Sequence, residues 1–414
     1  MNAFTFLFIL VVAVSFGLEW WLMRRQIAHV RNHRDSVPTA FQAAISLEAH
    51  QKAADYTVDK AHLAEVERLL GLALLLILTL GGGIESIRSL WVGLDLAAWL
   101  TGVGIILTTM LLMQVVEIPL SYYQTFVVEQ RYGFNRNTPR QFLTDLALQT
   151  GLSLAIAVPV LALILWIMQG VEQWWFWAWL FLMSFTLIMS WAYPTFIAPL
   201  FNRFTPLADD NLCNRIESLL QRCGFHSQGI FVMDGSRRSS HGNAYFTGIG
   251  ESKRIVFFDT LINTLEADEI EAVLAHELGH FKCHHVIKML GVSASITLTG
   301  FALLGWLSAQ TWFYTGLGVS EGSPAMALVL FMLVAPVFSA FLQPAMAWFQ
   351  RRHEFEADRF AATHARSEHL VSALVKLYRD NASTLTPDPL YSAFHYSHPP
   401  AAIRIAHLEA SKTA

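Results

Sequence analysis

Residues 266–312 read EADEIEAVLAHELGHFKCHHVIKMLGVSASITLTGFALLGWLSAQTW, and this single run joins a polar segment to an apolar one. Glu266–His285 is predicted to be a helix, because acidic side chains gather in its first turns, where they suit the positive end of the helix dipole. Val286–Trp312 is apolar and exceeds the roughly 20 residues that a helix needs to cross a bilayer. The stretch therefore predicts that a polar helix runs directly into a membrane span.

The rest of the chain has the composition of a protein that lies largely in lipid. Of its 414 residues, 54% are hydrophobic and only 14% are charged, whereas soluble domains carry about 25% charged residues. The apolar run at the N-terminus is interpreted as a retained span, because no basic region precedes it and no small-residue cleavage site follows it. Seven candidate spans result: Ala3–Met23, Leu69–Ile84, Leu96–Leu120, Leu146–Met168, Trp174–Leu200, Val286–Trp312 and Ala325–Phe349.

Basic residues are distributed unevenly between the loops, and this asymmetry predicts the orientation of the spans. They are concentrated in Arg24–Arg68, after the first span, and in Ser121–Asp145, after the third. The stretches that follow odd-numbered spans are therefore expected on the cytoplasmic side. Both Phe201–His285 and Gln350–Ala414 then lie on that side, where they can build one site together.

The polar segment 201–285 mixes helix and strand signals. Leu212–Cys223 has the spacing of an amphipathic helix. Short β-branched and aromatic runs bounded by polar residues are typical of strands, and three such runs occur at Gly229–Asp234, Asn243–Gly248 and Arg254–Asp259. We therefore expect a small α+β element before the polar helix.

The strongest chemical signal in the chain is the motif His276-Glu277-Leu278-Gly279-His280 on that helix. Residues four apart lie about 40° apart around a helix, so both imidazoles can reach one ion from the same face. Imidazole suits zinc, and Glu277 is placed to act as a general base. The alternative is an ordinary helix with two surface histidines. The neighbouring His284 and His285 are interpreted as interfacial polar residues at the start of the sixth span.

A catalytic zinc ion usually takes three protein ligands, so a third ligand must come from elsewhere in the chain. The tail opens with the residues RRHEFEAD at 351–358. Glu354 and Asp358 share a helix face, so one of them can bind metal while the other hydrogen-bonds a ligand histidine. On spacing alone, Glu354, Glu356 and His353 all remain open as the third ligand.

Further strings occur in order along the chain, before and after the His-Glu-x-x-His motif: RYGFN at Arg131–Asn135, SSHGNAYF at Ser239–Phe246, RIVFFDTL at Arg254–Leu261, EFEAD at Glu354–Asp358 and HYSHPP at His395–Pro400. Together with the motif they resemble the type I CAAX prenyl protease family of membrane zinc metalloproteases. The resemblance covers nearly the whole chain, and seven spans are also the pattern of that family.

The resemblance implies roles for the residues around the metal. Glu354 would be the third ligand of one zinc ion per chain, beside His276 and His280. Asp358 would hydrogen-bond a ligand histidine and have Arg404 as its partner.

It also implies a reaction and a substrate. His398 would stabilise the oxyanion of the scissile carbonyl, and Asn243 and Ala244 would lie on an edge strand that pairs with the substrate backbone. With Glu277 as the base, we expect a zinc metalloendopeptidase at the lipid bilayer. Its substrate would be a peptide or protein cut near its C-terminus, with a prenylated cysteine as the best candidate anchor.

The expected fold is mainly α: a polytopic membrane protein of about seven transmembrane helices with a small cytoplasmic α+β metalloprotease element and a helical C-terminal tail. Four regions are expected. They are a membrane region with five spans and two cytoplasmic loops, a cytoplasmic segment that ends in the motif helix, two further spans, and a tail that completes the site, at residues 1–200, 201–285, 286–349 and 350–414.

Two other functions compete with this one. A membrane-protein quality-control zinc protease is expected to be shorter and to have fewer spans. A transporter or receptor with a structural zinc ion is expected to carry ionisable residues within its spans, and here only Glu117 clearly does so.

The net charge and the cysteine content exclude some classes of partner and of structural site. A net charge of −4 argues against a nucleic-acid partner. The three cysteines, Cys213, Cys223 and Cys283, imply neither a disulfide framework nor a cysteine zinc site. Short loops and a short tail favour a bacterial inner membrane over the endoplasmic reticulum.

Overall fold

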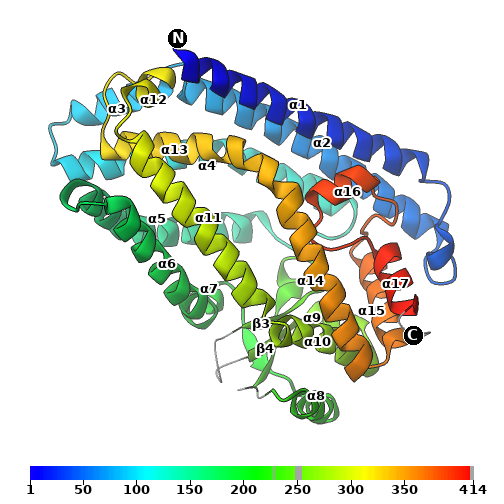
Figure 1. Ribbon diagram of the computed structural model, residues 1–414. Coiled ribbons are helices and arrows are strands. Elements are labelled where there is room, and N and C mark those ends of the chain that lie inside the picture. Colours follow the sequence, from blue (N-terminus) through cyan, green and yellow to red (C-terminus); the bar gives the residue numbers. More distant parts are fainter. Residues whose placement is uncertain (226, 228, 248–253, 411–414) are drawn as a thin grey trace.

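The computed structural model describes residues 1–225, 227, 229–247 and 254–410. Within these residues the protein is mainly helical with one small sheet, as predicted. Long helices fill one part of the molecule, and the sheet, α10 and the C-terminal helices gather at the other end (Figure 1). The long helices and those that continue them are α1 Ala3–Asn32, α2 Leu47–Leu78, α3 Gly83–Val92, α4 Ala98–Tyr123, α5 Pro139–Gly170, α6 Trp174–Ala192, α7 Ala198–Phe201, α11 His285–Leu307, α13 Pro324–Ser339 and α14 Gln343–His364.

The number of spans agrees with the prediction. Six helical stretches in the described part of the chain are long and apolar enough to cross a membrane, and a seventh results if α2 and α3 count as one span bent by 53°. Two of these stretches contain a π-helical segment. Gln124–Glu129 extends α4, and Tyr193–Ile197 joins α6 to α7.

The second span differs from its predicted boundaries. α2 begins at Leu47, so much of the predicted loop 24–68 is helical. It ends at Leu78, inside the predicted span Leu69–Ile84, and Gly82 with a φ of 76° allows the turn into α3. The pattern of hydropathy missed this break because the residues of the turn are not markedly more polar than the helices around it.

The seventh predicted span, Ala325–Phe349, is divided between α13 and α14. The 3-10 turn Ala340–Leu342 separates the two helices, and Pro336 lies one turn earlier, where it removes a backbone hydrogen bond. The change of direction lets α14 leave the span and run to α10 (Figure 1).

The sequence pattern predicted that the polar helix runs directly into the sixth span, but the structure shows a break between them. α10, Ala267–Lys282, ends before Cys283, and α11 begins at His285. Between them His284 adopts the left-handed conformation with a φ of 57°, which histidine tolerates better than most residues. In a continuous helix a residue five positions after His280 would point about 140° away from it, so the break reorients His285.

A four-stranded sheet lies beside α10, and three of its strands were predicted. Its order is β1-β2-β4-β3, with β2 and β4 parallel and the two outer pairs antiparallel. β3 therefore lies at one edge. The unpredicted strand is β1, a three-residue run that contains a proline. The strands are β1 Phe204–Pro206, β2 Ile230–Met233, β3 Ala244–Thr247 and β4 Arg254–Phe258.

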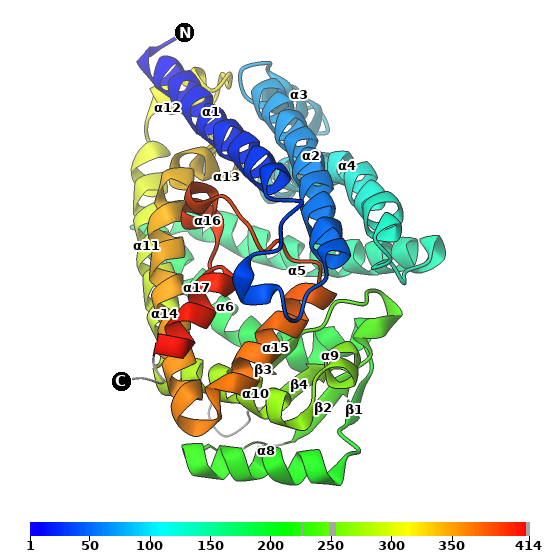
Figure 2. The ribbon, with the colours of Figure 1, turned by 90° about the vertical axis from the view of Figure 1, so that its right-hand side faces the viewer.

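Shorter helices complete the polar end. The buried face of α8 packs with β4 and α10 in one apolar core, through residues such as Ile216, Phe257 and Leu278. The C-terminal helices lie around α14 (Figure 2), and Asp388 ties them to α1 by an ion pair of 3.0 Å with Arg25. The shorter helices are α8 Asp210–Cys223, α9 Asp259–Thr264, α12 Thr311–Gly316, α15 Ser367–Asp380, α16 Pro389–His395 and α17 Ala401–Ala410, with 3-10 turns at Thr39–Phe41 and Gly235–Arg237.

Candidate active site

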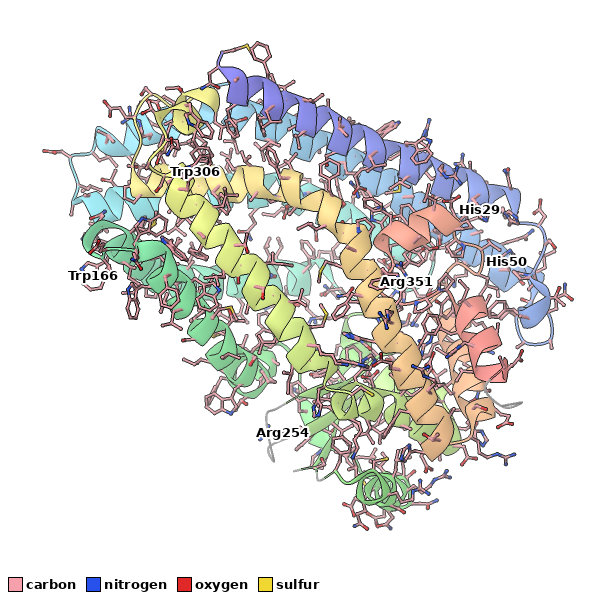
Figure 3. All side chains as sticks on the ribbon, in the orientation of Figure 1. His29, His50, Trp166, Arg254, Trp306 and Arg351 are labelled. Atoms are coloured by element: carbon pink, nitrogen blue, oxygen red, sulfur yellow. The ribbon has the colours of Figure 1, made fainter. Side chains whose placement is uncertain are left out.

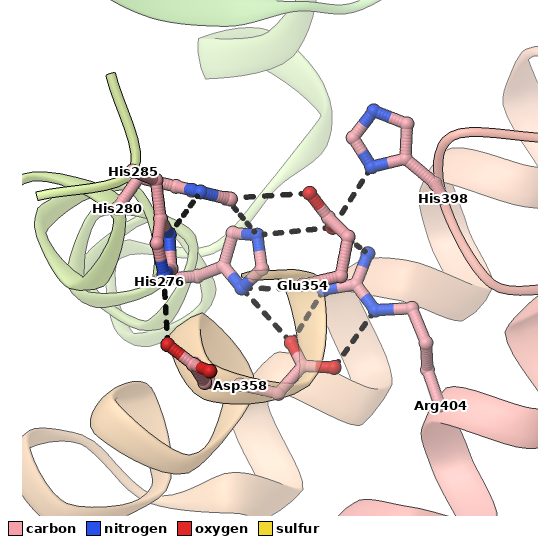
Figure 4. Close-up of polar contacts among 8 residues, drawn as sticks. His276, His280, His285, Glu354, Asp358, His398 and Arg404 are labelled. Atoms are coloured by element: carbon pink, nitrogen blue, oxygen red, sulfur yellow. Dashed lines mark hydrogen bonds and ion pairs between the residues drawn. The ribbon is translucent and has the colours of Figure 1, made fainter. Parts of the chain in front are cut away.

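Two helices bring together three side chains of the kinds that bind metal ions. α10 carries His276 and His280, and α14 carries Glu354 (Figure 4). His276 Nε2 is 3.2 Å from His280 Nε2 and 3.5 Å from Glu354 Oε2. His280 Nε2 is 3.3 Å from Glu354 Oε1. One donor atom from each residue lies within 4.8 Å of the other two, which is close enough for all three to hold one metal ion.

α10 is anchored at its start and along its buried face. Glu269 accepts a hydrogen bond from the backbone amide of Glu266 at 2.8 Å, in a capping box. The same carboxylate receives Lys376 of α15 at 2.8 Å. Leu274 and Leu278 are almost fully buried against the sheet and α15. The histidines therefore project from a helix that is fixed by both polar and apolar contacts.

A buried ion pair supports His276 from behind. Asp358, which is fully buried, lies 2.9 Å from His276 Nδ1. Arg404 of α17 contacts both oxygens of Asp358, at 2.9 and 2.5 Å. Burial disfavours a charged His276 ring, but hydrogen bonds to Asp358 and Glu354 outweigh it and raise the pKa of His276 to about 9. A metal ion that binds Nε2 therefore displaces a proton.

The surroundings of Glu354 fit a metal ion. Its Oε2 atom is buried and makes no hydrogen bond of regular geometry in the described part of the chain; the nitrogen atoms around it are His398 Nδ1 at 2.8 Å, His276 Nε2 at 3.5 Å and Arg404 Nη1 at 3.6 Å. A cation held between this buried carboxylate and the two imidazoles would compensate the negative charge of Glu354. Two histidines and one carboxylate also form a known ligand set of catalytic zinc sites.

Comparison with known proteins then identifies the family. Residues 26–203 match the family described as CAAX prenyl protease N-terminal, five membrane helices, and residues 206–412 match peptidase family M48. The chain belongs to peptidase family M48.

Individual relatives agree with this assignment. CAAX prenyl protease 1 of Saccharomyces cerevisiae is 41% identical over 316 residues, which cover 72% of this chain and 70% of the yeast protein. The CAAX prenyl protease 1 homolog of Caenorhabditis elegans is 31% identical over 440 residues and covers 98% of both chains. The crystal structure of S. mikatae Ste24p matches with a TM-score of 0.92 at 33% identity over 99% of both chains. This M48 peptidase is therefore a multi-pass integral membrane metalloprotease.

His398 of this M48 peptidase reaches Glu354 from the tail. It lies between α16 and α17, with its side chain 65% exposed and its Nδ1 2.8 Å from Glu354 Oε2. Arg351 of α14 (Figure 3) donates to the carbonyl oxygens of Tyr396 at 2.7 Å and Ser392 at 3.4 Å. These two bonds hold the segment that carries His398 against α14.

The remaining predicted residues lie on α10 and at the sheet edge. Glu277 is half-buried beside His276 on α10. Asn243 directly precedes β3 and is exposed, and its carbonyl accepts a hydrogen bond from the amide of Phe258 at 2.9 Å. Ala244 begins β3. The far side of β3 is paired with no other described strand, so the backbone there can receive an extended peptide.

His285 lies at the first position of α11, as expected for the start of the sixth span, but its side chain is buried and contacts His280 and Glu356. Its side chain is 3% exposed, its Nδ1 lies 3.0 Å from His280 Nδ1, and its Nε2 lies 3.1 Å from Glu356 Oε2. Glu356 was weighed only as a metal ligand. Both residues lie in or next to the motifs in the sequence. The predicted unbroken helix, however, would have pointed His285 away from His280.

Proposed function

We propose that this M48 peptidase is a zinc endopeptidase that cuts prenylated, CAAX-type proteins and peptides near their C-terminus. Its zinc ion would be held by His276, His280 and Glu354, one ion per chain. The observation that supports this most directly is the convergence of these three side chains from α10 and α14, with one donor atom of each within 4.8 Å of the others. The names of the relatives support the substrate class.

The other residues around the ligands supply acid-base and electrostatic assistance. A zinc ion bound here supplies Lewis acidity to the scissile carbonyl and lowers the pKa of water. Glu277 takes the proton of the attacking water and delivers it to the leaving amine. His398 donates a hydrogen bond to the developing oxyanion. Asp358, fixed by Arg404, orients His276.

The substrate backbone would pair with β3. Asn243 and Ala244 lie where a peptide can add to the sheet as a further strand. Main-chain hydrogen bonds hold such a peptide largely without regard to its side chains. Selectivity must then come from another part of the substrate, and an attached lipid is the natural source in a membrane enzyme.

The surroundings of the site suit a lipid anchor. α11 begins five positions after His280, which places the ligands beside a membrane helix. Away from the ligands, two cavities of about 540 and 580 Å³ lie between the membrane helices and are lined mainly by apolar side chains; no residue of the proposed site lines either of them. Burial of each CH₂ group contributes about 0.8 kcal/mol, so a farnesyl chain in such a space strengthens binding considerably.

We further propose that the site faces the cytoplasm, because the loops on its side of the membrane carry most of the basic residues. The choice of a bacterial inner membrane over the endoplasmic reticulum stays a prediction.

Matched peptides with and without a farnesyl group test the substrate. The expected result is a higher kcat/KM for the farnesylated peptide, with slower cleavage of its unmodified twin because backbone pairing still operates. Equal kcat/KM for the two peptides would contradict the prenyl preference and favour a membrane-protein quality-control protease. No cleavage of either, with zinc bound, would favour a structural zinc ion.

A further inference from the structure

Each of the two histidines on α10 directs one nitrogen toward Glu354 and the other away from it. The second nitrogen of His276 meets Asp358. The second nitrogen of His280 meets His285, at 3.0 Å between the two Nδ1 atoms (Figure 4). His285 in turn contacts Glu356 through its Nε2 atom at 3.1 Å. Both histidines therefore connect to a carboxylate, His276 directly and His280 through a second imidazole.

The protons of this chain of contacts have one consistent arrangement. If His280 binds metal through Nε2, its proton is on Nδ1, and that atom donates to His285. His285 Nδ1 must then accept, which places its own proton on Nε2, and Nε2 donates to Glu356. Every donor meets an acceptor, so the contacts reinforce one another.

The packing around His285 fixes its ring in this position. The side chain is 3% exposed, and its ring stacks on that of His353 at 4.0 Å with an angle of 13° between the planes. Glu356 is 30% exposed and also lies 3.7 Å from Lys288 of α11. The chain of contacts thus begins at His280 and ends at the ion pair of Glu356 with Lys288. Because this ion pair is partly exposed to solvent, the charge of Glu356 has only a small desolvation cost.

We propose that His285 and Glu356 position His280: they hold its ring and its tautomer ready for the metal. The inference rests on the proposed role of His280 as a ligand. Hydrogen-bond partners of metal-binding histidines typically contribute 10–100-fold to metal affinity. His285 and Glu356 are positioning residues in this account, since they touch neither the substrate nor the reacting atoms.

A second metal ion is the competing interpretation of the same cluster. One donor atom each from Cys283, His285 and Glu356 lies within 4.8 Å of the others. The distance from His285 Nε2 to Glu356 Oε2, 3.1 Å, is that of a direct hydrogen bond. Contacts of similar length occur among His276, His280 and Glu354, so this distance does not separate the two interpretations. The positioning role is favoured because His285 Nδ1 also lies 3.0 Å from His280 Nδ1, which links His285 to a proposed ligand.

The test measures zinc affinity on the full-length protein in detergent, by competition with a chelator, together with the Tm of the metal-free form. His285→Phe removes the acceptor and keeps a ring for stacking. His285→Asn restores an acceptor close to the position of Nδ1. Glu356→Gln removes only the charge at the far end. His284→Asn is the matched control, because His284 is exposed and asparagine tolerates its left-handed backbone.

The proposal expects one zinc ion per chain and a 10–100-fold weaker zinc affinity in His285→Phe, with the metal-free Tm unchanged. His285→Asn should regain part of the loss, Glu356→Gln should show a smaller loss, and the control should match the wild type. Wild-type affinity in both His285→Phe and Glu356→Gln would overturn the proposal. So would two zinc ions per chain, one of them lost in Cys283→Ser.

The variant Glu354→Ala distinguishes a failure of the proposed metal site from a failure of the positioning role. If that variant binds zinc as the wild type does, the proposed metal site fails. If it loses zinc while His285→Phe and Glu356→Gln keep full affinity, only the positioning role fails.

Discussion

Gly279 of α10 and Ala357 of α14 lie so close together that a Cβ atom on Gly279 would be 2.9 Å from the Cα atom of Ala357. No side chain fits in that space without moving backbone. The contact sits one residue before His280 and between Glu354 and Asp358, so the two helices come close together where the proposed ligands converge. The closeness of the backbones sets the separation of the proposed ligands.

Gly279→Ala should therefore weaken metal binding as well as the fold. The added methyl group pushes α10 and α14 apart, and overpacking of this kind costs about 1–3 kcal/mol. We expect a lower Tm and reduced zinc content after dialysis. Gly291→Ala on α11 is the control, because a Cβ there meets no described atom within 4 Å. Equal zinc content and equal Tm in the two variants would contradict this role of Gly279.

Glu277→Gln should keep its zinc and its fold but lose turnover. The amide has nearly the shape of the carboxylate and cannot accept the proton of the attacking water. Loss of a general base typically costs 10²–10⁴-fold. The measurement is kcat on a farnesylated peptide, alongside zinc analysis of the same sample. Near-normal kcat with full zinc content would remove Glu277 from the mechanism.

Removal of the metal ion and the substitution Glu354→Ala should both abolish cleavage. Chelation should abolish cleavage, and one equivalent of Zn²⁺ should restore it in the wild type. Glu354→Ala lacks one of three proposed ligands and should not recover at that concentration. Glu217→Ala serves as the control, since Glu217 is exposed on α8. If Glu354→Ala recovers as readily as the control, the third ligand lies elsewhere.

His398→Ala should lower kcat by roughly 10²–10³-fold with little change in KM, as expected for the loss of an oxyanion donor. Its imidazole reaches Glu354 at 2.8 Å but is largely exposed, so its removal should not disturb the fold. The measurement is kcat and KM of the purified variant from steady-state kinetics. An increase in KM at constant kcat would instead make His398 a substrate-binding residue.

The membrane orientation can be measured by labelling single cysteines with an impermeant thiol reagent, after the three native cysteines are replaced by serine. Ala208→Cys precedes α8, and Leu94→Cys follows α3; both positions are exposed. The uneven distribution of basic residues predicts that Leu94→Cys is labelled in intact cells and that Ala208→Cys is labelled only after lysis. The reverse pattern would invert the topology.

Much of the architecture could be predicted from local patterns. Apolar runs of sufficient length predicted the spans, because the bilayer imposes that length on any helix that crosses it. Short β-branched runs predicted β2, β3 and β4. The break between α2 and α3 escaped prediction, as did the turn between α13 and α14. Hydropathy averages over a window and does not register where the backbone turns.

The sequence by itself determined that two histidines and a glutamate share one turn of helix, because the helical repeat places residues four apart on one face. Spacing left Glu354, Glu356 and His353 open as the third ligand, since their choice depends on which face of α14 meets α10. The resemblance to the family pointed to Glu354, and the tertiary structure brings this side chain to His276 and His280, beside the contact of Gly279 with Ala357. The tertiary structure also decided the place of His285, because a single left-handed residue, His284, turns the chain so that His285 contacts His280, a proposed ligand.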